Sequence, residues 1–127
     1  FYLFVKSSPN PDNLLLLVSD HVNGKFERVE GFDDSMGAQT KGMYEAPTAV
    51  KLADGRWCLF ADFYGAGCAG QGYVPFVSDD LTKGVFTRAD EAFHFPYGFK
   101  HGTILPITEE EYERMLARDW TDVPDLR

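Results

Sequence analysis

Cysteine is scarce in this sequence. Cys58 and Cys68 are the only two cysteines among 127 residues. Two cysteines are too few for the disulfide framework of a small secreted domain, and they form neither a Cys-x-x-Cys pair nor a Cys/His zinc set. We therefore expect two semi-buried free thiols, because unpaired cysteine behaves as a small apolar side chain.

Basic residues are also few. The chain has 12 Lys and Arg against 20 Asp and Glu, which gives a formal net charge of -8. Surfaces that bind nucleic acid or anionic membranes need clustered Lys and Arg, whereas the basic residues here are scattered. We therefore expect neither nucleic acid nor membrane as a partner, and a neutral ligand such as a sugar fits the charge better.

Long apolar runs are missing as well, and we expect no signal peptide within these residues. The longest apolar run, Leu14 to Val18, has the length of a strand and falls far short of the about 20 residues of a membrane span. We expect a soluble chain, although the sequence assigns no compartment. The strand-like start at Phe1, with no initiating Met, predicts a piece of a longer protein.

The sequence is rich in aromatic, Gly and Pro residues. Aromatic residues make up 15% of the chain, with 12 Gly and 7 Pro spread along it. This composition predicts one packed domain of short strands joined by turns. The strands are expected at residues 1–6, 14–20, 26–29, 44–52, 57–64, 73–78, 85–89 and 102–107, with loops at 7–13 and 65–72 and a long connection at 30–42.

One helix is expected near the C-terminus. Thr108 and Glu111 have the spacing of a capping box, and the acidic run 109–111 suits the positive end of a helix dipole. We expect this helix to run to about Arg118 and to be followed by an extended tail. Its expected inner face consists of Tyr112, Met115 and Leu116.

Two parts of the chain resemble each other. Val18-Ser19-Asp20 recurs as Val77-Ser78-Asp79, and Gly24-Lys25-Phe26 recurs as Gly84-Val85-Phe86. A repeat period of about 40 to 60 residues with several strands per unit is typical of propeller blades. We predict an all-β fold, a partial β-propeller of about two blades of antiparallel strands plus a short C-terminal helix. A small antiparallel sandwich would explain the strand count but not the repeat.

The repeat divides the single domain, residues 1–127, into three parts. Residues 1–30 form an incomplete blade, residues 43–89 a complete blade, and residues 100–118 the innermost strand of a next blade with the helix. Glu45 and His101 then lie near the starts of two innermost strands, where we expect them to converge on one site. A partly buried carboxyl would have a raised pKa, which suits a general acid. The alternatives are a solvated Glu at a strand end and a structural His.

Several motifs together resemble the latter half of glycoside hydrolase family 43, over about residues 1–116. Members of that family are five-bladed β-propellers that act on arabinosides and xylosides. The motifs are Tyr44-Glu45-Ala46-Pro47-Thr48, Asp54-Gly55-Arg56-Trp57-Cys58-Leu59-Phe60, Val77-Ser78-Asp79-Asp80-Leu81 and Lys100-His101-Gly102-Thr103-Ile104.

The resemblance implies roles for two residues. Glu45 would be the general acid that protonates the leaving glycosidic oxygen. His101 would lie at the centre of the propeller channel, where it would bind the substrate, a water or a calcium ion. Lys100 stands where the family has Arg, so a bidentate contact made by that Arg is not expected here.

The family resemblance also implies an inverting mechanism, which needs a carboxylate base opposite the acid. In the family, that base and a further Asp come from blades that precede this portion, and Asp20 and Asp62 do not fall on the matching motifs. We therefore expect a portion of a hydrolase of arabinose- or xylose-containing glycans that supplies the acid, lacks the base and is inactive when isolated.

Two other interpretations stay open. The chain could be a non-catalytic carbohydrate-binding or protein-interaction module, in which the aromatic stretch 93–99 stacks on a sugar or packs between blades. Its open sheet edges also predict self-association, because unpaired strands can pair with another chain.

Overall fold

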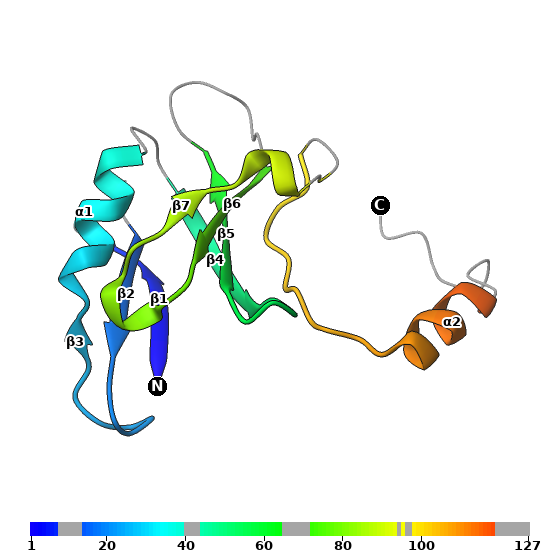
Figure 1. The fold of residues 1–127 in the computed structure, drawn as a ribbon, viewed down its shortest axis with the longest axis horizontal. Helices are drawn as coiled ribbons and strands as arrows, with labels where there is room; N and C mark the ends of the chain where they lie inside the picture. Colours follow the sequence, from blue (N-terminus) through cyan, green and yellow to red (C-terminus); the bar gives the residue numbers. More distant parts are fainter. Residues whose placement is uncertain (8–13, 40–43, 65–71, 94, 96–97, 119–127) are drawn as a thin grey trace.

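The computed structural model describes residues 1–7, 14–39, 44–64, 72–93, 95 and 98–118. Two antiparallel sheets form the body of the molecule, in the strand orders β1-β2-β3 and β4-β5-β6-β7 (Figure 1). The elements are β1 (Tyr2–Lys6), β2 (Leu14–Val18), β3 (Glu27–Arg28), α1 (Glu30–Gln39), β4 (Tyr44–Lys51), β5 (Trp57–Phe63), β6 (Gly72–Ser78), the 3-10 turn η1 (Leu81–Lys83), β7 (Thr87–Arg88), the 3-10 turn η2 (Asp90–Ala92) and α2 (Glu109–Ala117).

This architecture confirms an all-β fold and is consistent with the predicted partial propeller. All strands expected before residue 90 are present, and most are shorter than expected. No helix in the described part of the chain is long and apolar enough to cross a membrane. Of the loops expected at 7–13 and 65–72, residues 8–13 and 65–71 lie outside the described residues, as do Cys68 and the expected tail after 118, whereas Gly72 begins β6.

The sequence repeat is also a repeat of hydrogen bonding. Ser19 Oγ accepts the N–H of His21 at 3.3 Å after the first sheet's second strand, and Ser78 Oγ accepts the N–H of Asp80 at 3.2 Å after the second sheet's third strand. Both serines are buried. The short strands β3 and β7 then follow at matching positions, so the two motifs terminate equivalent strands in the same way.

An aromatic cluster joins the two sheets. The rings of Phe4, Phe32 and Phe86 meet edge to face, with centroids 5.8, 6.0 and 5.4 Å apart, the geometry that aromatic quadrupoles favour. Ser35 adds a pair of hydrogen bonds, because its Oγ donates to the Phe86 carbonyl and accepts the Phe86 N–H, both at 2.8 Å. Helix α1 and β1 are thereby tied to the second sheet.

The long connection expected at residues 30–42 is wrong, because residues 30–39 form α1. Phe32 and Met36 are four residues apart and both are buried, so the helix has a narrow apolar face. Two Gly and many polar residues give the segment a low intrinsic helix propensity. Packing against the sheets stabilises this helix, as it does most short helices.

Residues 102–107 were expected to form an innermost strand, and the structure assigns no strand there. Figure 1 shows this segment running away from the sheets towards α2. A strand needs a neighbour to receive its backbone hydrogen bonds, and no neighbouring strand lies beside this segment in the described residues. The alternating sequence therefore has nothing to pair with here.

Helix α2 is confirmed, but its expected inner face is wrong. Thr108 Oγ1 accepts the N–H of Glu111 at 3.2 Å, and Glu111 Oε2 accepts the N–H of Thr108 at 2.7 Å, which completes the capping box. The helix lies apart from both sheets (Figure 1), so three large apolar side chains on it are exposed. These are Tyr112, Met115 and Leu116.

The expectation of a semi-buried thiol can be assessed only for Cys58. Its side chain is free and fully buried in β5. Burial raises the pKa of the Cys58 thiol to about 12, so the thiol stays neutral and packs as an apolar group.

Two glycines of α1 should respond in opposite ways to the same substitution. A Cβ on Gly31 would lie 2.2 Å from the Lys83 carbonyl oxygen, whereas a Cβ on Gly37 would meet nothing within 4 Å. We expect Gly31→Ala to lower the free energy of unfolding by about 1–3 kcal/mol, and Gly37→Ala to raise it by about 0.5–1 kcal/mol. Urea titrations of both variants would measure this, and equal effects would contradict the packing of α1 on η1.

Candidate functional site

A bulge in β4 shapes the start of the candidate site. Glu45 pairs with Asp62 across β4 and β5, and the register shifts between Glu45 and Thr48. Ala46, inside this bulge, has a φ of 46°, in the left-handed region that non-glycine residues rarely adopt. Bulges of this kind redirect a side chain and are common beside active sites.

Glu45 and His101 come together as the sequence predicted. His101 Nε2 lies 3.7 Å from Glu45 Oε1, although the residues are far apart in the chain. His101 also has a left-handed backbone, with a φ of 55°, and its side chain is 55% exposed. Glu45 therefore precedes a residue with a strained backbone, and His101 has a strained backbone itself. Such strain is often found at functional sites.

Asp62 is the site residue that sequence reasoning missed. Its side chain is 1% exposed, and its Oδ2 accepts the backbone N–H of His101 at 2.9 Å. The same Oδ2 lies 3.6 Å from His101 Nδ1. The sequence did contain a signal for Asp62, because an acidic residue is unusual in an apolar strand such as Trp57–Phe63. Its pairing with Glu45 across the two strands could not be read from the sequence.

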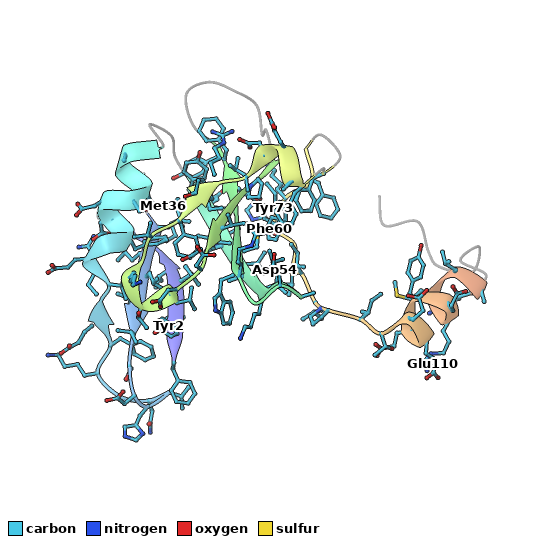
Figure 2. All side chains as sticks on the ribbon, viewed as in Figure 1. Tyr2, Met36, Asp54, Phe60, Tyr73 and Glu110 are labelled. Atoms are coloured by element: carbon cyan, nitrogen blue, oxygen red, sulfur yellow. The ribbon has the colours of Figure 1, made fainter. Side chains whose placement is uncertain are left out.

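Tyr73 fixes the segment that carries His101. Its backbone N–H donates to the Phe99 carbonyl at 3.1 Å, and its hydroxyl donates to the Gly102 carbonyl at 2.5 Å. Tyr73 in turn packs beside Phe60 on the second sheet (Figure 2). Tyr73 of β6 thus binds the chain before and after His101, at Phe99 and Gly102, and Asp62 binds the N–H of His101 itself.

Lys6 completes the site from the first sheet. Its Nζ donates to Glu45 Oε2 at 2.7 Å and lies 4.5 Å from the centroid of the Tyr64 ring. Lys6 ends β1, two residues after Phe4, and therefore shares the face that packs towards the second sheet. The ion pair consequently bridges the two sheets at the site.

The two carboxyl groups have opposite electrostatic environments. The hydrogen bond from Lys6 lowers the pKa of Glu45, so the expected raised pKa of this residue is wrong. Burial, partly offset by the hydrogen bond from the His101 N–H, raises the pKa of Asp62. A lowered folded-state pKa means that Glu45 stabilises the fold above its unfolded pKa, and that this contribution is lost as the pH falls through the folded value.

The described residues do not fit the calcium ion that the family resemblance implied. Calcium takes six to eight oxygen ligands, and no group of three or more His, Cys, Asp or Glu in this part of the chain could hold a metal. Near His101, Glu45 is paired with Lys6, and Asp62 is buried under the His101 backbone.

Removing the Lys6 ammonium should raise the pKa of Glu45. In Lys6→Met the cation that favours the ionised form is gone, so we expect the Glu45 carboxyl to titrate at a higher pH than in the wild type. Carbon-13 NMR of the side-chain carboxyl groups would measure the change.

Lys25→Met is the matched control, because Lys25 forms an exposed pair with Glu27 at 3.5 Å on the first sheet. It should leave the titration of Glu45 where it is. An unchanged Glu45 in Lys6→Met would show that the ion pair does not control this carboxyl.

Comparison with known protein families gives a match. The family model described as a probable glycosyl hydrolase domain, related to glycoside hydrolase family 43, matches residues 1–113. Neither the curated proteins nor the solved structures contain a match to the chain. Since the matched segment spans most of the 127 residues, the chain belongs to this family of probable glycosyl hydrolase domains related to glycoside hydrolase family 43.

Proposed function

We propose that this chain supplies the general acid of an inverting glycoside hydrolase that acts on arabinose- or xylose-containing glycans. Glu45 is the acid, and His101 binds the sugar or a water beside it. The observation that carries the proposal is the 3.7 Å approach of Glu45 and His101, in a chain that belongs to a glycosyl hydrolase family. The base comes from outside the described residues.

The exposure of the two side chains suits these roles. Glu45 is 25% exposed, so a glycosidic oxygen can reach its carboxyl group, while the His101 ring is exposed enough to donate to a sugar hydroxyl. A general acid gives its proton to the leaving oxygen as the bond to the anomeric carbon breaks. The Ala46 bulge and the hydrogen bond that the His101 N–H donates to Asp62 hold the backbones of Glu45 and His101 in place in the absence of a ligand.

Lys6 opposes the acid role in the free protein, because it keeps Glu45 ionised. The proposal therefore includes a change on binding: the sugar separates the Lys6 ammonium from the carboxylate, and Lys6 then donates to a sugar hydroxyl. Lysine suits this exchange, since its flexible stem carries three donors.

Replacing the acid tests the proposal in the complete protein. Glu45→Gln keeps the shape but cannot protonate the leaving group, so kcat/KM for a natural arabinoside or xyloside should fall by about 10²–10⁴. Cleavage of an aryl glycoside, whose leaving group needs little protonation, should fall much less.

Glu27→Gln is the matched control, because Glu27 is also paired with a lysine but lies exposed on β3. It should retain wild-type turnover of both substrates. Equal turnover of the natural glycoside by wild type and Glu45→Gln would refute the acid role.

A non-catalytic carbohydrate-binding module is the second candidate, favoured by one exposed aromatic residue. Phe99 is 48% exposed and stacks on Phe95 at 5.9 Å, so its outer face is open to a sugar. Phe93 and Phe95 instead pack edge-on against Phe60, as aromatic residues of a core do. Self-association through the sheet edges stays a prediction.

Calorimetry separates the two candidates. A binding module should take up arabino- or xylo-oligosaccharides without cleaving them, and Phe99→Ala should weaken that binding by about ten-fold or more, as expected for a lost stacking ring. Leu105→Ala, at a side chain that is 74% exposed in the segment before α2, should leave the affinity unchanged. Absence of heat with any of these sugars would contradict the module.

A further inference from the structure

The ionised state of Glu45 in the free protein conflicts with its proposed role as general acid, and the neighbouring residues can resolve this conflict. A general acid must hold a proton when the glycosidic bond breaks, yet Lys6 at 2.7 Å keeps the Glu45 carboxyl ionised in the free protein. Once the sugar displaces Lys6, Glu45 must gain a proton before the glycosidic bond breaks, and a neighbouring carboxyl whose ionisation is disfavoured is a suitable source.

Asp62 is placed to be that group. It lies directly across the strand pair from Glu45, it is 1% exposed, and its Oδ1 has no hydrogen-bond partner among the described residues. A buried carboxyl with one unpaired oxygen is costly to ionise, and burial accordingly raises its pKa. Two neighbouring carboxyls whose environments favour opposite protonation states are a usual arrangement in acid–base sites.

The His101 ring lies between the two carboxyl groups. Nδ1 is 3.6 Å from Asp62 Oδ2, and Nε2 is 3.7 Å from Glu45 Oε1. Each distance is about half an ångström beyond a hydrogen bond, so a small movement of the ring closes either contact. The backbone N–H bond to Asp62 and the left-handed φ fix the main chain of His101 and so place its ring near both carboxyl groups.

We propose that Asp62 is a positioning residue that stores a proton and delivers it to Glu45 through the His101 ring. In the resting arrangement, Asp62 O–H points to Nδ1, and Nε2–H points to the Glu45 carboxylate. On delivery, the Asp62 proton moves to Nδ1 and the Nε2 proton moves to Glu45. The ring stays neutral, Asp62 becomes a carboxylate and Glu45 becomes the acid. This proposal depends on the proposed function for its use in catalysis, but not for the arrangement of protons.

Other titratable groups face this trio and set its balance. Lys6 approaches from β1 and Lys100 from the segment before His101, and both favour the ionised form of Glu45. Tyr73 approaches from β6, where its hydroxyl is already donated to Gly102. Of these groups, Lys6 is the one in direct contact with Glu45, so removing it should move the proton.

The tautomer of His101 is the readout, because a merely structural Asp62 would not control it. Nitrogen-15 NMR of the imidazole in the full chain should show the Nε2–H tautomer in the wild type and the Nδ1–H tautomer in Lys6→Met. A mixture of tautomers in the wild type, or the same tautomer in both proteins, would overturn the proposal.

Asp62→Asn tests whether Asp62 is the source of the proton. The amide oxygen can still accept the His101 N–H, so the fold is retained, but the amide has no proton to give. Adding Asp62→Asn to Lys6→Met should therefore abolish the tautomer change, and a change that persists would refute the role of Asp62. Asp20→Asn is the matched control at an exposed position and should preserve the change.

Activity measurements distinguish a failure of this proposal from a failure of the proposed function. In the complete protein, Asp62→Asn should lower kcat/KM for a natural glycoside by about ten-fold or more, with little effect on an aryl glycoside. If the wild type cleaves no glycoside, the proposed function fails, while the tautomer measurements still decide the proton arrangement. Full activity of Asp62→Asn in an active protein would overturn the delivery step.

Discussion

The aromatic contact between the two sheets is the interaction on which the site depends. Phe4 from β1, Phe32 from α1 and Phe86 beside β7 pack edge to face in the core. Because alternate residues of a strand share a face, the packing of Phe4 also directs Lys6 towards the second sheet. The Lys6–Glu45 ion pair at 2.7 Å is thus a consequence of core packing as much as of charge.

Most of the fold follows from local patterns, and the exceptions have physical causes. The strands before residue 90 were predictable because alternation, turn residues and the repeat all agree. Helix α1 was not, because Phe32 and Met36 form its apolar face in a segment whose composition disfavours helix. Residues 102–107 have a strand-like sequence, but pairing requires a second strand, which sequence alone cannot supply.

The candidate site was predictable only in part. The expected convergence of Glu45 and His101 agrees with the 3.7 Å between their side chains, although His101 does not begin a strand as the repeat implied. Asp62 and Lys6 could not be found in this way, because their places depend on strand register. The bulge after Glu45 shifts that register, and a one-residue shift reverses which side chains share a face.

The ion pair that bridges the sheets couples the chemistry of the site to the mechanics of the domain. Lys6 and Glu45 belong to different sheets, and the Coulomb attraction between them weakens as the sheets separate. A substitution deep in the aromatic cluster would therefore change how readily Glu45 takes a proton, without touching the site. Selection for a more rigid or a looser interior would therefore change the pKa of the Glu45 carboxyl at the same time, because that pKa depends on the distance to Lys6.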